Sequence, residues 1–305
     1  MDPAWNLAEG RGFTSVGFGL QREGELWAAA PPLYPLVLAS WLKVWGGGVL
    51  QARSLNYVFA LVAAGLIVRA TALGGVIGRP WARVGLFVIL LTASGIAFAY
   101  RCGRLDTMLS MLVGVGFYCA MARPCVPGLV ASGLCAMAMA WAGFQVCAYA
   151  ALLGLVGLVW LRGRFMGRVL AFAVGGGVGL CVLYAYFRWA GGLEKVIEYT
   201  RYHMNSYFLG SNGFEDSSYR ILLLCCLVAV ALGWALREKG MARGGLAGLA
   251  LGVGLPCCIM VLGHFPIYYS WMGILPAAVG LMSCADDRAA ARFGGRWEIC
   301  AVGVV

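Results

Sequence analysis

Asp106 is the position in this chain where chemistry is easiest to foresee. It opens the apolar run LDTMLSMLVGVGFY and follows Arg104 by two residues. As a helix cap, its carboxylate would satisfy free N–H groups at a helix N-terminus. As a site residue, it would position a metal ion, a phosphate-binding arginine or a substrate hydroxyl, because ionisable groups at membrane depth usually face a cavity. The two roles are compatible.

Other ionisable side chains fall in a few polar segments. The opening stretch MDPAWNLAEGRGFTS carries Asp2 and Glu9, and the turn YRCGRLD carries Arg101 beside Arg104. Carboxylates can serve as general bases, and arginines bind phosphate through paired N–H donors. These segments therefore predict acid–base and phosphate chemistry.

Two histidines and an aromatic cluster leave two interpretations open. His203 follows an amphipathic stretch, and His264 precedes a cluster that includes Tyr268. Each histidine fits a structural place at the membrane interface, where aromatic residues also gather. Each also fits a ligand or phosphate contact, so His203, His264 and Tyr268 stay candidates.

The composition predicts the elements that must hold these residues. Of 305 residues, 62% are hydrophobic and only 12% are charged, which is typical of an integral membrane protein. Apolar runs of about 16 to 20 residues match the length of bilayer-spanning helices. The predicted fold is all-α, a polytopic membrane helical bundle with about nine to ten transmembrane helices and additional juxtamembrane helices. The predicted spans are 54–72, 84–99, 106–122, 126–141, 143–161, 169–187, 221–236, 245–262 and 267–283, with a further one from Ile299.

Two segments are predicted to lie at the membrane surface. The run 33–48 is short, contains Pro35 and Lys43, and ends in three glycines, which favours an interfacial helix. The loop 188–219 contains LEKVIEYTRYHMNSYF, whose apolar residues recur at helical spacing. Its expected apolar face consists of Leu193, Val196, Ile197, Thr200, Met204, Tyr207 and Phe208. The predicted organisation is thus an extracytoplasmic loop at 1–53, then a transmembrane bundle at 54–305 that includes the loop 188–219.

Charge predicts the orientation. With 1–53 outside, the short inner loops are all basic and the acids concentrate outside, as lysine and arginine bias in short loops requires. The net charge of +10 is then topological, and nucleic acid is discounted as a partner.

Five segments in order resemble one known family. They are MDPAWNLAEGRGFTS, PPLYPLVLA, ARSLN, YRCGRLD and HFPIYYSWMGILPA. Together they resemble the bacterial GT-C membrane glycosyltransferases related to protein O-mannosyltransferases and lipid A aminoarabinose transferases. The resemblance implies that the polar start is the family's first extracytoplasmic loop, with a preceding helix absent from this sequence. It also implies that Asp2 occupies the place of that loop's active-site acid.

The resemblance further implies a substrate and roles. The donor would be a polyprenyl-phosphate-linked sugar, and the acceptor a lipid, a glycan or a protein, at the outer face of a bacterial inner membrane. Asp2 would be the base or acceptor-positioning acid and Asp106 a second acid, with a divalent metal ion between them as an open option. Arg101, Arg104 and His264 would bind the donor phosphate. Weaker candidates for the acid are Glu9, Glu23 and Glu25.

Two rival classes stay open. A lipid or sugar transporter or flippase would also have many glycine-rich spans, although it needs broken helices or polar groups at mid-membrane. A non-catalytic, truncated remnant of the transferase family is the other alternative.

Overall fold

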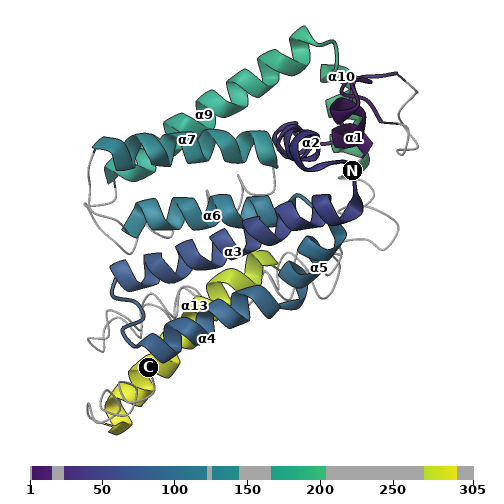
Figure 1. Cartoon of the computed structure of the whole chain (residues 1–305). Helices are drawn as coiled ribbons and strands as arrows, with labels where there is room; N and C mark the ends of the chain where they lie inside the picture. Colours follow the sequence, from purple (N-terminus) through teal and green to yellow (C-terminus); the bar gives the residue numbers. More distant parts are fainter. Residues whose placement is uncertain (1, 16–23, 122–125, 144–165, 204–270, 294–305) are drawn as a thin grey trace, which may run out of the picture.

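The computed structural model describes residues 2–15, 24–121, 126–143, 166–203 and 271–293. This part of the chain is helical and contains no strand, apart from one isolated antiparallel bridge between Thr14 and Leu26. The all-α prediction is therefore confirmed for the described residues. Figure 1 shows the helices packed into a bundle with the N-terminus at one end.

The two ends of the bundle are named here by a buried carboxylate at each. The Asp106 end holds α1 (Asp2–Ala8), α2 (Leu33–Trp45) and α10 (Leu193–His203), together with the first residues of α3 (Val49–Leu73) and α6 (Asp106–Met121) (Figure 1). The Asp286 end holds the turn after α3 and the later part of α13 (Trp271–Phe293). The described segments that are predicted to lie on the outer side of the membrane are at the Asp106 end. Those predicted to lie on the inner side are at the Asp286 end. Which end faces the cell exterior stays a prediction.

The surface helix α2 forms where the sequence predicts one, but it is shorter than 33–48. It ends at Trp45 because Gly46 adopts a positive φ of 89°, a conformation that glycine accepts without strain. Its buried side includes Tyr34, Leu38 and Leu42. Helix α1 packs on α2, and α3 begins only a few residues later at Val49. The predicted boundary between residues 53 and 54 therefore falls inside α3.

The predicted span 84–99 is broken into two helices. These are α4 (Pro80–Thr92) and α5 (Ser94–Cys102), which meet at an angle of 52°. Ala93 has ψ 134° and leaves the helical region at the sequence Thr-Ala-Ser-Gly. Sharp helix bends are found at Gly and Ser pairs, so Ser94 and Gly95 account for the break.

Helices α7 (Val126–Ala142) and α9 (Met166–Trp189) cross at glycine. A Cβ on Gly175 would lie 2.6 Å from the Cα of Gly133 and collide with its carbonyl. Close approach through small residues is how helices pack in lipid, where water supplies no driving force between them. A hydrogen bond of 3.0 Å from Trp141 Nε1 to the Gly179 carbonyl oxygen fixes the same interface. These two helices form one side of the bundle (Figure 1).

The surface helix α10 is present, but its predicted apolar face is partly wrong. Tyr199 is buried with Leu183, Phe187 and Ala28, whereas Ile197 is exposed. The buried side therefore runs through Leu193, Val196 and Tyr199. Burial of a large aromatic ring outweighs that of a smaller aliphatic side chain, which accounts for the rotation of the helix.

At the Asp286 end, α13 is fastened to the turn between α3 and α4. The Gly78 backbone N–H donates to Asp286 Oδ2 at 2.6 Å, and Arg79 Nε lies 3.7 Å from Asp286 Oδ1. Ser283 Oγ donates to the Val76 carbonyl oxygen at 3.1 Å. Asp286 is therefore a buried link between elements far apart in sequence.

Two described helices are long and apolar enough to cross a membrane. They are Val49–Leu73 and Val169–Trp189, and α4 with α5 would add a third if the bent pair counts as one span. Helices α6 and α7 and the core of α13 are apolar but shorter. The structure thus supports transmembrane helices, while the predicted count of about nine to ten spans stays a prediction. The predicted spans 143–161, 221–236 and 245–262 and the one from Ile299 lie outside the described residues.

Candidate functional site

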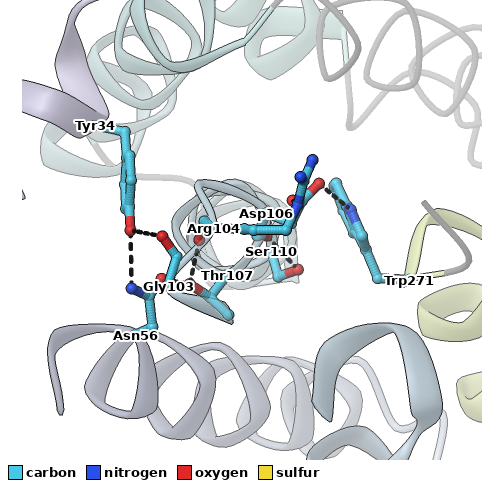
Figure 2. A network of polar contacts seen from close by, with 8 residues as sticks. All are labelled: Tyr34, Asn56, Gly103, Arg104, Asp106, Thr107, Ser110 and Trp271. Atoms are coloured by element: carbon cyan, nitrogen blue, oxygen red, sulfur yellow. Dashed lines mark hydrogen bonds and ion pairs between the residues drawn. The ribbon is translucent and has the colours of Figure 1, made fainter. Parts of the chain in front are cut away.

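The strongest candidate site surrounds Asp106, the first residue of α6. Its side chain is only 1% exposed. Oδ2 accepts a hydrogen bond of 2.9 Å from Arg104 Nε, and Oδ1 accepts one of 3.1 Å from Trp271 Nε1 on α13 (Figure 2). A buried carboxylate is tolerated when it is paired and hydrogen-bonded, and here both oxygens are. Asp106 thus holds a cation and an indole together at one end of the bundle.

The turn before α6 gives Arg104 its direction. Helix α5 ends at Gly103, which has a left-handed φ of 65°, and the Arg104 backbone N–H returns to the Ala99 carbonyl oxygen at 3.0 Å. Glycine is favoured in this position because a Cβ would be strained there. The Arg104 side chain remains 32% exposed while it bonds Asp106. The turn therefore presents a guanidinium at the boundary between the buried carboxylate and the surface.

A second set of polar contacts holds this turn from the opposite side. Tyr34 of α2 donates its hydroxyl to the Gly103 carbonyl oxygen at 2.6 Å and accepts a hydrogen bond of 2.8 Å from Asn56 Nδ2 on α3. Thr107, next to Asp106, donates its hydroxyl to Asn56 Oδ1. Figure 2 shows this chain of contacts from Tyr34 through Asn56 toward α6. Both the turn and the first residues of α6 are thereby fixed to α2 and α3.

Burial changes the acidity of Tyr34. Removal from water raises the pKa of its hydroxyl to about 12, and the negative charge of Asp106 adds to the rise. The Asn56 hydrogen bond and the positive charge of Arg104 oppose it. The tyrosine is therefore a neutral donor over the physiological range, and it acts through position rather than through ionisation.

The contacts of Asp106 bear on the predicted metal. Each of its oxygens already accepts from an N–H donor, and the described residues contain no group of three His, Cys, Asp or Glu side chains close enough to hold an ion. This donor set does not fit a divalent-ion site, so no step is derived through a metal. The predicted pairing of Asp2 with Asp106 around an ion stays a prediction, because the Asp2 side chain is outside the description.

Arg101 and Glu9 lie in different surroundings. Arg101 is exposed in the last turn of α5, three residues before Arg104. Glu9 accepts a hydrogen bond of 2.6 Å from Trp5 Nε1 and pairs with Arg11. It lines a cavity of about 160 Å³ between α1 and α2. The other residues that line this cavity are Trp5, Ala8, Leu42, Lys43 and Gly47. Glu9 is thus a surface carboxylate with partners of its own, outside the Asp106 network.

The remaining candidates are placed only in part. Asp2 is the first residue of α1, and His203 is the last residue of α10, both at the Asp106 end. The structure does not describe the side chains of these two residues. Glu23, His264 and Tyr268 lie entirely outside the described residues. Glu25 is described and is half-buried. The structure therefore brings Arg104 and Asp106 together among the candidates and leaves the other pairings as predictions.

Four network residues were given no role by sequence reasoning: Tyr34, Asn56, Thr107 and Trp271. Tyr34, Asn56 and Trp271 each lie within a segment that carries the family resemblance. Asn56 carried a usable signal, because an amide in an apolar run needs a partner. Trp271 carried none, since aromatic residues near span ends are usual without any specific contact.

Comparison with known proteins found no relative. No protein-family model matches the chain, and neither the curated proteins nor the solved structures gave a match.

Proposed function

We propose that this protein is a membrane glycosyltransferase that moves a sugar from a polyprenyl phosphate donor to an acceptor hydroxyl at the outer face. The observation that carries the proposal is the convergence of separate segments on Asp106. Segments PPLYPLVLA, ARSLN, YRCGRLD and HFPIYYSWMGILPA each contribute a side chain or backbone group to one buried polar network. Those segments are four of the five on which the family resemblance depends.

The transfer has two chemical needs. The acceptor oxygen forms a bond to the anomeric carbon while the bond from that carbon to the phosphate oxygen breaks, and the acceptor proton must leave. A carboxylate takes the proton, and a cation stabilises the charge that develops on the departing phosphate. In the proposed mechanism Asp2 is the base, and Arg104 with Arg101 meets the phosphate.

Asp106 has a positioning role in this mechanism. It is buried behind Arg104 and bonded to it, so it orients the guanidinium rather than touching the acceptor. Arginine suits a phosphate because its donors lie in a fixed plane, and a bonded carboxylate restricts the rotamers of that plane. Helices α2 and α3 fix the turn itself through Tyr34 and Asn56.

The decisive experiment is donor turnover by the purified protein in lipid vesicles. The wild type should release polyprenyl phosphate from at least one member of a panel of polyprenyl-phosphate sugars when acceptor lipids are present. Arg104→Lys keeps the charge but loses the planar fork, so turnover should fall by about ten- to a hundredfold. The proposal fails if the folded wild type consumes no donor, or if Arg104→Gln turns over at the wild-type rate.

One observation favours the transporter alternative. Helices α4 and α5 form a broken pair with a bend of 52°, and transporters use broken helices around their sites. The residues at this break are Thr92, Ala93 and Ser94, with no charged group among them. Vesicles that contain the protein and a labelled polyprenyl-phosphate sugar separate the two functions. Movement of intact donor between leaflets without bond cleavage would favour the transporter.

A further inference from the structure

Two exposed arginines at the Asp106 end lie outside the buried network. Arg53 is in the second turn of α3, and Arg101 is in the last turn of α5. Within the described part of the chain, neither forms an ion pair. Exposed arginines at a membrane boundary attract anionic groups, and phosphate matches the planar donors of arginine best.

An aromatic pair connects the two helices that carry these arginines. Tyr57 lies one turn after Arg53 and therefore on the same face of α3. Its ring packs against Tyr100 of α5 with centroids 4.5 Å apart, and Tyr100 donates its hydroxyl to the Leu91 carbonyl oxygen at 3.2 Å. Arg101 directly follows Tyr100. The ring contact therefore joins the parts of α3 and α5 that carry the two arginines.

An exposed apolar face runs along α3 away from the arginines. It contains Tyr57, Val58, Leu61 and Val62, all of which are at least 40% exposed. The opposite face of α3 is buried in the bundle core through residues such as Phe59 and Ile67. Because α3 is long and apolar enough to span a membrane, its exposed face would contact hydrocarbon. The surface thus combines two cationic side chains with an exposed apolar helix face.

We propose that this surface, made of Arg53, Arg101 and the exposed face of α3, binds the polyprenyl phosphate of the donor. Arg53 and Arg101 bind the phosphate, and the isoprenoid chain lies along Tyr57, Val58, Leu61 and Val62. This inference rests on the proposed function and adds to it a further phosphate contact, Arg53, beside Arg104 and Arg101, and a path for the lipid. Arg101 is three residues from Arg104, so a phosphate held here lies near the turn that orients the reacting end.

Binding of a long-chain polyprenyl monophosphate to the purified full chain in phosphatidylcholine nanodiscs tests the proposal. The double variant Arg53→Gln/Arg101→Gln should bind at least tenfold more weakly, because it loses two charge-assisted contacts. Arg69→Gln is the matched control, since Arg69 is an exposed arginine on the same helix near the other end. It should bind within about twofold of the wild type, which is small on the scale of one such contact. Equal binding by the double variant and the wild type would overturn the proposal.

Two further arms identify the lipid and its path. Phosphatidylglycerol should compete poorly, and competition equal to that of polyprenyl monophosphate would make the surface a general anionic-lipid site and overturn the assignment. A polyprenyl phosphate with a photoreactive group in its chain should label α3 around Leu61. Equal labelling of α9, whose Val174 and Val178 are also exposed, would overturn the proposed path.

The binding assay and the turnover assay test the two proposals separately. If no donor is consumed but binding depends on Arg53 and Arg101, the transferase proposal falls and a lipid-phosphate site stands. If donor is consumed at equal rates and equal affinities by the wild type and the double variant, the lipid site and the phosphate role of Arg101 fall, while the transferase activity stands.

Discussion

The Trp271 indole N–H donates a hydrogen bond of 3.1 Å to Asp106 Oδ1, across 165 positions of sequence. Both side chains are almost completely buried. The contact fixes the start of α13 against the start of α6, so the C-terminal part of the described chain helps to hold the candidate site. A helix cap alone needs no such distant partner, and this relationship makes Asp106 a link between elements.

A double-mutant cycle on this pair should show coupling. Asp106→Asn places an NH₂ group opposite one of two N–H donors, and an unsatisfied buried donor costs about 1 to 3 kcal/mol. Trp271→Phe removes the N–H and should cost about 1 kcal/mol. Denaturation in detergent of both single variants and the double variant gives the coupling energy. Simple additivity of the two losses would mean that the hydrogen bond contributes no stability.

Tyr34→Phe should change how stability depends on pH. Burial raises the pKa of the Tyr34 hydroxyl from 10.0 to about 12, so the folded protein retains a proton that the unfolded chain releases. The stability contributed by this group is complete below pH 10 and is lost between about pH 10 and 12. The melting temperature of the wild type should therefore fall steeply as the pH rises through this interval. In Tyr34→Phe the fall should be shallower, while at pH 8 the variant should be less stable because Asn56 and Gly103 lose their partner.

An equal slope in the wild type and Tyr34→Phe would remove Tyr34 as the cause. Tyr57→Phe, which removes the hydroxyl of an exposed tyrosine in place of a buried one, is the matched control.

The glycine crossing of α7 and α9 gives a third prediction. Gly175→Ala should lower stability by about 1 to 3 kcal/mol, the usual cost of overpacking, because its Cβ would collide with the Gly133 backbone. Gly177, on the same helix, provides the matched control Gly177→Ala, since a Cβ there would meet nothing within 4 Å. Detergent melting of both variants is the measurement. Similar stability of the two variants would mean that the helices do not cross at Gly175.

The sequence predicted the helices better than the contacts between them. Spans 54–72, 106–122 and 126–141 correspond to the helices α3, α6 and α7, because a long apolar run favours one continuous helix. Of these three, only α3 is long enough to count as a candidate span. The break at Ala93 was not predicted, since the run 84–99 contains no charged residue and hydropathy does not register a Ser-Gly bend. The angle between α4 and α5 depends on backbone geometry at one residue.

The site was predictable only as single positions. Asp106 and Arg104 stood out because charged residues beside an apolar run need an explanation. Trp271, which donates to Asp106, and Asn56, which accepts from the neighbouring Thr107, come from distant segments. No local pattern specifies which helices become neighbours. The placement of Asp106 between Arg104 and Trp271 is therefore a property of helix packing.

The last prediction concerns the sides of the membrane. Exposed Glu194 lies on α10 at the Asp106 end, and exposed Leu73 ends α3 at the Asp286 end. Because the short loops predicted inside are basic, Glu194→Cys should react with a membrane-impermeant thiol reagent added to intact cells, in a background without the native cysteines. Leu73→Cys should react only after the membrane is permeabilised. Labelling of Leu73→Cys but not of Glu194→Cys in intact cells would reverse the orientation and place the Asp106 network on the inner side. Labelling of both positions in intact cells would mean that α3 does not cross the bilayer.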